Sequence, residues 1–151
     1  MVRLKELGHV LLRVLDLERS KKFYSEVLGF KVLEEDPEHG GTFMALDGQS
    51  HAIDLFQVKD PEAARRQTPG VRGLGHIAFR VESEDALREA YATLQAQGVE
   101  ITRTIDHVSQ KSIYFNDPDG TTLEIYFELP DALQIFARGR ADRDVPLVLD
   151  R

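Results

Sequence analysis

An internal repeat is the feature that most constrains the fold of this chain. The segment LGHVLLRV at residues 7–14 returns as LGHIAFRV at residues 74–81, at an offset of 67 residues. Each copy places a histidine at the head of an apolar run that has the period of a half-buried strand. The chain is therefore expected to fold as two copies of one supersecondary unit.

Hydrophobic periodicity and turn residues predict the order β-α-β-β-β in each copy, which is an α+β fold. In the first copy, a strand is expected at 4–14, a helix capped by Asp16 and ended by Gly29 at 17–28, and strands at 30–35, 42–46 and 51–58. In the second copy, a strand is expected at 73–81, a helix at 83–97, and strands at 99–106, 111–115 and 121–129. The predicted organisation is a first module (4–58), a linker (59–72), a second module (73–129) and a C-terminal helix and polar tail (130–151).

Composition excludes several classes of function. The net charge of −7 and pI near 5.2 argue against nucleic acid as a partner, because binding to phosphates requires a basic surface. The sequence has no membrane-spanning run and no secretory leader, which predicts a cytoplasmic protein. It also has no cysteine, so any bound metal must take nitrogen and oxygen ligands.

Three residues form a candidate metal-ligand set. Strand alternation places His9 and His76 on the polar face of their strands, and Glu124 on the corresponding face of the last predicted strand. Two imidazoles and one carboxylate form the facial triad that suits Fe(II) and leaves coordination positions open. The alternative is that these are hydrogen-bonded or solvated residues, but two histidines at the same repeat position favour ligands.

The segment IDHVSQKSIYFNDPDGTTLE at residues 105–124 strengthens this interpretation. With both LGH triplets and the ending LEIYFE, residues 4–129 resemble the vicinal oxygen chelate superfamily. That superfamily includes glyoxalase I, fosfomycin-resistance transferases, methylmalonyl-CoA epimerase and type I extradiol dioxygenases. The resemblance implies two βαβββ modules that form a cup-shaped mixed sheet with the helices outside.

Within the superfamily, His107, Tyr114 and Glu124 resemble the signature of one-domain extradiol ring-cleavage dioxygenases. The resemblance implies that Fe(II), or Mn(II) or another divalent metal, binds at His9, His76 and Glu124. It further implies that Tyr114 hydrogen-bonds an oxygen of a catecholic substrate and that His107 helps to position the diol or serves as a proton donor. His51 is expected to manage protons beside O2, and the protein is expected to be a homodimer or a higher homo-oligomer. Aromatic side chains are expected to line the site, with Phe43, Phe56, Phe79 and Tyr126 as candidates.

Two alternatives stay open. Asp54 occupies the place in the repeat that Glu124 occupies, which resembles the additional carboxylate ligand of a glyoxalase- or fosfomycin-transferase-like enzyme using the metal as a Lewis acid. A non-catalytic drug-binding resistance protein is the other alternative, and the intact ligand set disfavours it. Strict alternation puts His51 and Asp54 on opposite faces, so both reach one site only if the strand starts irregularly near residues 48–50.

Two groups of residues are expected to lie outside any site. His39 is predicted to be an exposed turn residue. Arg138, Arg140 and Arg143, with Asp142 and Asp144, are predicted to lie in a solvated tail that carries one apolar patch at residues 145–149.

Overall fold

The computed structural model describes residues 1–3, 5–36, 38–60, 64, 73–139 and 143–149. The chain forms two compact units, Met1–Arg66 and Gln67–Arg151. Most of the linker predicted at 59–72 lies outside the described residues, as do Leu4, Arg140 and Asp142.

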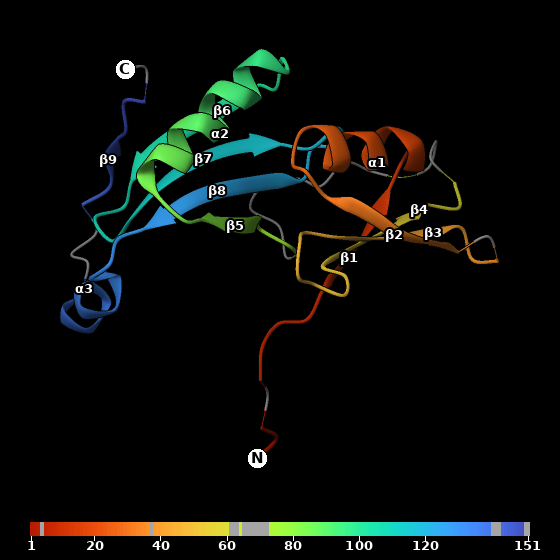
Figure 1. Ribbon diagram of the computed structural model, residues 1–151, viewed down its shortest axis with the longest axis horizontal. Helices are drawn as coiled ribbons and strands as arrows, with labels where there is room; N and C mark the ends of the chain where they lie inside the picture. The colour runs from red at the N-terminus through yellow and green to blue at the C-terminus, as the bar shows by residue number, and fades with distance from the viewer. Residues whose placement is uncertain (4, 37, 61–63, 65–72, 140–142, 150–151) are drawn as a thin grey trace. The chain divides into compact units, whose positions relative to one another are not determined.

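The first unit is a four-stranded mixed sheet with one helix. Strand β4 lies between β1, to which it is parallel, and β3, to which it is antiparallel, and β2 forms the other edge. Helix α1 packs against β4 and β2 (Figure 1). The elements are β1 (Val10–Val14), α1 (Leu17–Glu26), β2 (Lys31–Asp36), β3 (Gly41–Ala45) and β4 (Ile53–Gln57).

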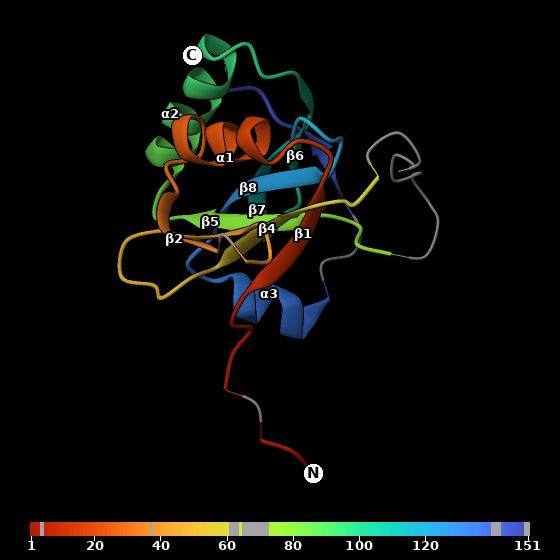
Figure 2. The ribbon, with the colours of Figure 1, turned by 90° about the vertical axis from the view of Figure 1, so that its right-hand side faces the viewer.

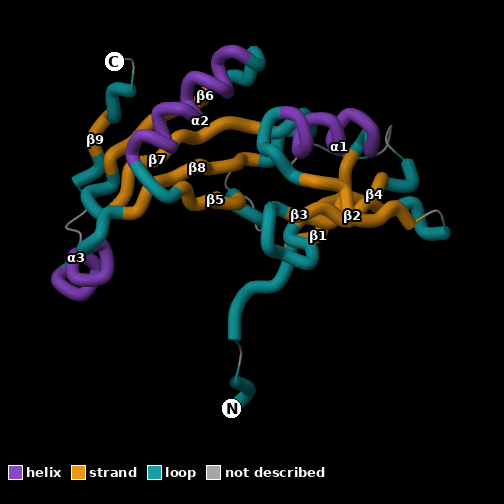
Figure 3. Tube along the Cα trace, viewed as in Figure 1, coloured by secondary structure: helices purple, strands orange, loops and turns teal. Residues whose placement is uncertain are grey.

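The second unit repeats this order and adds two elements at its C-terminal end (Figure 3). Its sheet has the order β5-β8-β7-β6-β9, with β5 and β8 parallel and the other pairs antiparallel. Helix α2 packs on this sheet as α1 does in the first unit. The elements are β5 (Ile77–Val81), α2 (Glu84–Ala96), β6 (Ile101–Asp106), β7 (Gln110–Asn116), β8 (Thr122–Glu128), α3 (Ala132–Arg138) and β9 (Val145–Pro146).

The repeat extends to the register of the strands. In the first unit Leu11 pairs with Asp54, and in the second unit Ala78 pairs with Glu124. Each module also carries a register shift of the same size between its second and third strands, at Val32/Glu34 and at Ile101/Arg103. The predicted α+β class and both β-α-β-β-β modules are confirmed. The closing of the two sheets around one cup remains a prediction.

The helix ends follow the predicted capping signals. The Asp16 carboxylate accepts a hydrogen bond from the Arg19 backbone N–H at 2.9 Å, and the Ser83 hydroxyl accepts one from Ala86 N–H at 3.0 Å. After α1, Gly29 adopts a φ of 77°, a left-handed conformation that favours glycine and ends the helix.

The core of each unit lies between its helix and its sheet. In β1, Leu12 and Val14 are buried while Leu11 and Arg13 are exposed, which confirms the predicted alternation. Burial of each large apolar side chain contributes about 1.5–3 kcal/mol. The largest fully buried residues are Tyr24, Met44, Ile53 and Leu55 in the first unit and Leu87, Leu94, Ile113, Phe115 and Leu123 in the second.

The first strand is shorter than predicted. It begins at Val10 rather than at residue 4, and the described residues before it run away from the sheet (Figure 2). The reason is pairing: Val10 lies opposite Ile53, where β4 itself begins, so earlier residues have no strand beside them. In the same way β5 begins at Ile77 rather than at residue 73. His9 and His76 therefore each lie immediately before a strand.

The predicted polar tail is anchored to the sheet through its apolar stretch, residues 145–149. Val145 and Pro146 pair with β6, and Leu149 is buried. The Thr104 hydroxyl donates a hydrogen bond to the Leu147 carbonyl at 2.7 Å. In the part of the chain that the structure describes, no helix is long and apolar enough to cross a bilayer.

Candidate metal centre

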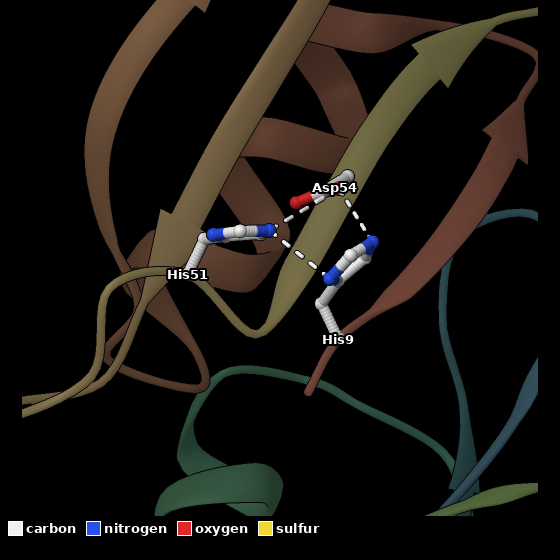
Figure 4. Close-up of side chains that lie close together, drawn as sticks. All are labelled: His9, His51 and Asp54. Atoms are coloured by element: carbon white, nitrogen blue, oxygen red, sulfur yellow. Dashed lines mark hydrogen bonds and ion pairs between the residues drawn. The ribbon is translucent and has the colours of Figure 1, made fainter. Parts of the chain in front are cut away.

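Two histidines and a carboxylate converge in the first unit (Figure 4). His9 precedes β1, Asp54 lies on β4, and His51 lies in the loop that leads into β4. His51 Nε2 is 3.1 Å from His9 Nδ1, and Asp54 Oδ2 is 3.6 Å from His9 Nε2 and 3.9 Å from His51 Nε2. One ligand atom from each residue lies within 4.8 Å of the others, so the three can bind a single cation.

The burial of Asp54 indicates a need for positive charge. Its side chain is only 4% exposed, and its Oδ1 has no hydrogen-bond partner among the described residues. A buried carboxylate that lacks hydrogen bonds is costly unless a cation compensates it. The donor chemistry of the cluster therefore fits a divalent metal.

The irregular strand start that the sequence required is present. Strand β4 begins at Ile53, so His51 lies outside the strand. The alternation of side chains along β4 therefore does not fix the direction of the His51 side chain. Its ring lies 4.4 Å from the His9 ring and 5.9 Å from the Phe43 ring, centroid to centroid. His51 and Asp54 therefore reach the same place.

The second unit presents a matching pair. His76 Nε2 lies 3.0 Å from Glu124 Oε2, and the Glu124 side chain is only 3% exposed. The Gln110 amide donates a hydrogen bond to the other Glu124 oxygen at 2.9 Å, which fixes the carboxylate. In both units a half-exposed imidazole thus lies beside a buried carboxylate on the neighbouring parallel strand.

A phenol and an imidazole lie beside this pair. Tyr114 is directly opposite Glu124 in the β7–β8 ladder, and its hydroxyl is 2.9 Å from His107 Nε2. Burial and the nearby Glu124 carboxylate raise the pKa of Tyr114 to about 12, against the opposing effect of Arg103, whose guanidinium lies 4.2 Å from the ring centroid. Tyr114 therefore remains a neutral phenol across the physiological pH range.

The turn that carries His107 is strained. Val108 has a φ of 70°, a left-handed conformation that is costly for a β-branched residue. The turn is held by hydrogen bonds from Val108 N–H to Asp106 Oδ1 and from His107 N–H to the Gln110 carbonyl, both at 2.8 Å. Such strain persists where surrounding contacts impose it, and it often accompanies functional positions.

The structure brings together some of the predicted site residues within each unit. His9 and His51 meet in the first unit, and His76, Glu124, Tyr114 and His107 form a connected group in the second. The set of His9 with His76 and Glu124 takes residues from both units and remains a prediction.

The predicted aromatic lining residues lie on different faces of their strands. Phe56 shares the strand face of Asp54, and Tyr126 shares that of Glu124. Phe79 alternates with Ala78 and so lies on the opposite face from Glu124. His39 is exposed as expected, but its Nδ1 contacts Asp36 Oδ2 at 2.8 Å.

Sequence reasoning missed Gln110, Arg103 and Asp144. Gln110 was detectable in principle, because it alternates with Ser112 and Tyr114 along β7 on the side that faces Glu124. Arg103 depends on a register shift, and Asp144, which contacts His107, depends on a distant strand pairing. Neither of these two leaves a local signal in the sequence.

Comparisons with known proteins identify the family. The model of the Glyoxalase/Bleomycin resistance protein/Dioxygenase superfamily matches residues 6–125, and the chain belongs to this superfamily. The chain is 29% identical over 142 residues to biphenyl-2,3-diol 1,2-dioxygenase 2 of Rhodococcus globerulus, covering 92% of this chain and 73% of that protein. It is 37% identical over 125 residues to lactoylglutathione lyase of Haemophilus influenzae, covering 77% and 87%.

A solved structure agrees on the fold. The glyoxylase/bleomycin resistance protein/dioxygenase domain from Frankia sp. superposes with a TM-score of 0.74 at 27% identity, covering 84% of this chain and all of that one. The relatives thus include both an oxygenase and a lyase, so membership of the superfamily does not fix the reaction.

Proposed function

We propose that this member of the superfamily is an Fe(II)-dependent extradiol dioxygenase that cleaves a catecholic ring with O2. His9, His76 and Glu124 are the proposed iron ligands. The observation that carries the proposal is the hydrogen bond between His107 and Tyr114 at 2.9 Å, with Tyr114 directly opposite Glu124. Diol cleavage uses polar groups of this kind at the substrate, whereas Lewis-acid chemistry on this scaffold does not require them.

When bound, Fe(II) would supply open coordination positions for both diol oxygens and for dioxygen. The residues around it are suited to that metal, because imidazole and carboxylate are its usual protein ligands. The Gln110 amide holds one oxygen of Glu124, which leaves the other directed toward His76. Such fixed ligands need little reorganisation when the metal binds.

Tyr114 is the proposed substrate-positioning group. Because its pKa is raised to about 12, it exchanges hydrogen bonds as a neutral phenol and adds no negative charge beside Glu124. A neutral hydroxyl there orients a diol oxygen, and His107 in turn fixes the Tyr114 hydroxyl. Orientation and proton handling of this kind contribute roughly 10²–10⁴-fold to the rate.

His51 is the proposed proton-transfer group on the oxygen side. Its Nε2 lies 3.1 Å from His9, and its side chain is 34% exposed, so it can exchange protons with solvent or with a bound substrate. The proposed partners are therefore a small aromatic diol and O2, and the proposed assembly is a homodimer or a higher homo-oligomer.

Asp54 favours a second candidate function. Its pairing register matches that of Glu124, and its Oδ2 lies 3.6 Å from His9 Nε2. As a fourth protein ligand it would take a position that diol and dioxygen need. The protein would then be a glyoxalase- or thiol-transferase-like enzyme in which the metal polarises the substrate.

The test is to purify the protein without oxygen, load it with Fe(II), and mix it with a catechol panel in air. Coloured ring-cleavage products and equimolar O2 uptake are expected, with both reduced roughly 10²–10⁴-fold in His107→Ala and Tyr114→Phe. Tyr91→Phe, on helix α2, is the matched control. Activity toward a hemithioacetal or a thiol-transfer substrate without O2 uptake would instead support the second candidate.

A further inference from the structure

The C-terminal segment brings a carboxylate to His107. Asp144 Oδ1 lies 2.8 Å from His107 Nδ1, while the other ring nitrogen, Nε2, lies 2.9 Å from the Tyr114 hydroxyl. The His107 side chain is 12% exposed and that of Asp144 is 38% exposed, so the contact lies at the edge of the site. Asp144 is also outside residues 6–125, which match the superfamily.

This contact has a structural basis, because the segment that follows Asp144 is anchored to β6. Val145 pairs with Asp106, the residue immediately before His107. The Leu147 N–H donates to the Thr104 carbonyl at 3.2 Å, and the Thr104 hydroxyl donates back to Leu147 at 2.7 Å. Leu149 is buried, and Arg88 donates to its carbonyl at 3.4 Å. These contacts bring Asp144 to the His107 ring.

The distance determines where the ring proton resides. A carboxylate oxygen and an unprotonated ring nitrogen are both hydrogen-bond acceptors, and they repel each other at 2.8 Å. The contact has the distance of an ion pair but does not meet the geometry of a hydrogen bond. The repulsion that an unprotonated Nδ1 would meet favours a proton on that nitrogen.

We propose that Asp144 is a positioning residue that keeps the proton of neutral His107 on Nδ1. Nε2 then retains its lone pair and accepts the hydrogen bond from Tyr114. The Tyr114 oxygen is left with lone pairs that accept a hydrogen bond from a substrate hydroxyl. Without Asp144, a proton on Nε2 reverses the bond between His107 and Tyr114, and Tyr114 then presents a donor instead. This catalytic consequence rests on the proposed function, whereas the tautomer itself does not.

Nitrogen-15 NMR of the full-length protein tests the tautomer directly, at a pH high enough that the His107 ring is neutral. The parent is expected to show the proton on Nδ1, and Asp144→Ala is expected to show it on Nε2. Asp144→Asn keeps the size but removes the charge, and it is expected to shift the tautomer in the same direction by less. Asp131→Ala, an exposed aspartate at the start of α3 whose side chain makes no capping hydrogen bond, is the control and is expected to match the parent.

Turnover of a catechol by the same variants separates the two proposals. In Asp144→Ala, kcat is expected to fall on the order of 10- to 100-fold, the usual effect of losing a group behind a functional side chain, with a smaller change in KM. A proton that stays on Nδ1 in Asp144→Ala would overturn the assignment of Asp144. A tautomer that changes as expected in a protein that cleaves no catechol would uphold that assignment and overturn the dioxygenase proposal.

Discussion

Asp54 and Glu124 occupy equivalent positions in the two modules. Each lies on the fourth strand of its module, pairs with the second residue of the first strand, and is nearly fully buried beside the histidine that precedes that strand. The two differ in their hydrogen bonds. Gln110 donates to Glu124, whereas Asp54 Oδ1 has no such partner among the described residues.

Iron binding is expected to require three residues in particular. The parent should bind one Fe(II) per chain, and His9→Ala, His76→Ala and Glu124→Ala should each lose it, because two remaining protein ligands hold a labile ion poorly. Binding should also weaken as the pH falls, since a protonated imidazole cannot bind a metal. Elemental analysis after gel filtration measures this, with His39→Ala as the control. Full iron content in all three variants would contradict the proposed ligand set.

Substitutions at Asp54 and His51 discriminate between the two candidate reactions. If the protein is a dioxygenase, Asp54→Ala should keep its iron and part of its catechol cleavage, because the diol and O2 need the position that Asp54 would fill. His51→Ala should also keep iron but lose most turnover. Metal content and O2 uptake are measured together. Loss of metal in Asp54→Ala, with turnover unaffected in His51→Ala, would move the protein to the glyoxalase-like class.

Tyr114 is expected to ionise with a pKa of about 12, above its ordinary value of 10.0. An ultraviolet absorbance titration should show a tyrosine that ionises at this high pH in the parent and in Tyr126→Phe. The same ionisation should be missing in Tyr114→Phe. Because the folded-state pKa is raised, the phenol's contribution to stability is fully present below pH 10 and is lost as the pH rises through about 12. A parent titration with every tyrosine ionised by pH 11 would refute the burial argument.

Gly41 is expected to tolerate no side chain. It pairs with Phe56, and a Cβ at residue 41 would collide with the Phe56 ring. Gly41→Ala should therefore destabilise the fold by about 1–3 kcal/mol in urea unfolding, the usual cost of overpacking. Gly8→Ala, whose Cβ would meet nothing within 4 Å, is the control. Adding Phe56→Leu should recover part of the loss, and no recovery would place the strain elsewhere.

The strain at Val108 predicts a substitution that stabilises the protein. Asparagine tolerates the left-handed conformation better than valine, so Val108→Asn should raise the free energy of unfolding by about 1 kcal/mol. Urea unfolding measures the change. Val148→Asn is the control, because Val148 is exposed and does not have a positive φ. This substitution should leave stability nearly unchanged. Equal effects at both positions would mean that Val108 is not strained.

Local patterns in the sequence predicted the helices and strands and which residues share one face of a strand. Asp16 and Ser83 cap the helices as expected, because capping involves only residues within one turn. Alternation correctly placed Leu12 and Val14 inside, because a strand has a period of two whatever lies beside it. The duplicated LGH triplets predicted two modules of one kind. These features depend on neighbours in the chain.

The tertiary structure decided the features that depend on distant pairing. The start of β1 follows from where β4 begins, and the meeting of His51 with Asp54 follows from the irregular entry into β4. Asp144 reaches His107 because residues 145–146 pair with β6, a contact across nearly forty residues that no local periodicity encodes. Sequence by itself therefore determined which residues carry reactive groups and which strand faces they share. Only the long-range strand pairing, which balances the loss of chain entropy against backbone hydrogen bonds and burial, decided which of those groups touch.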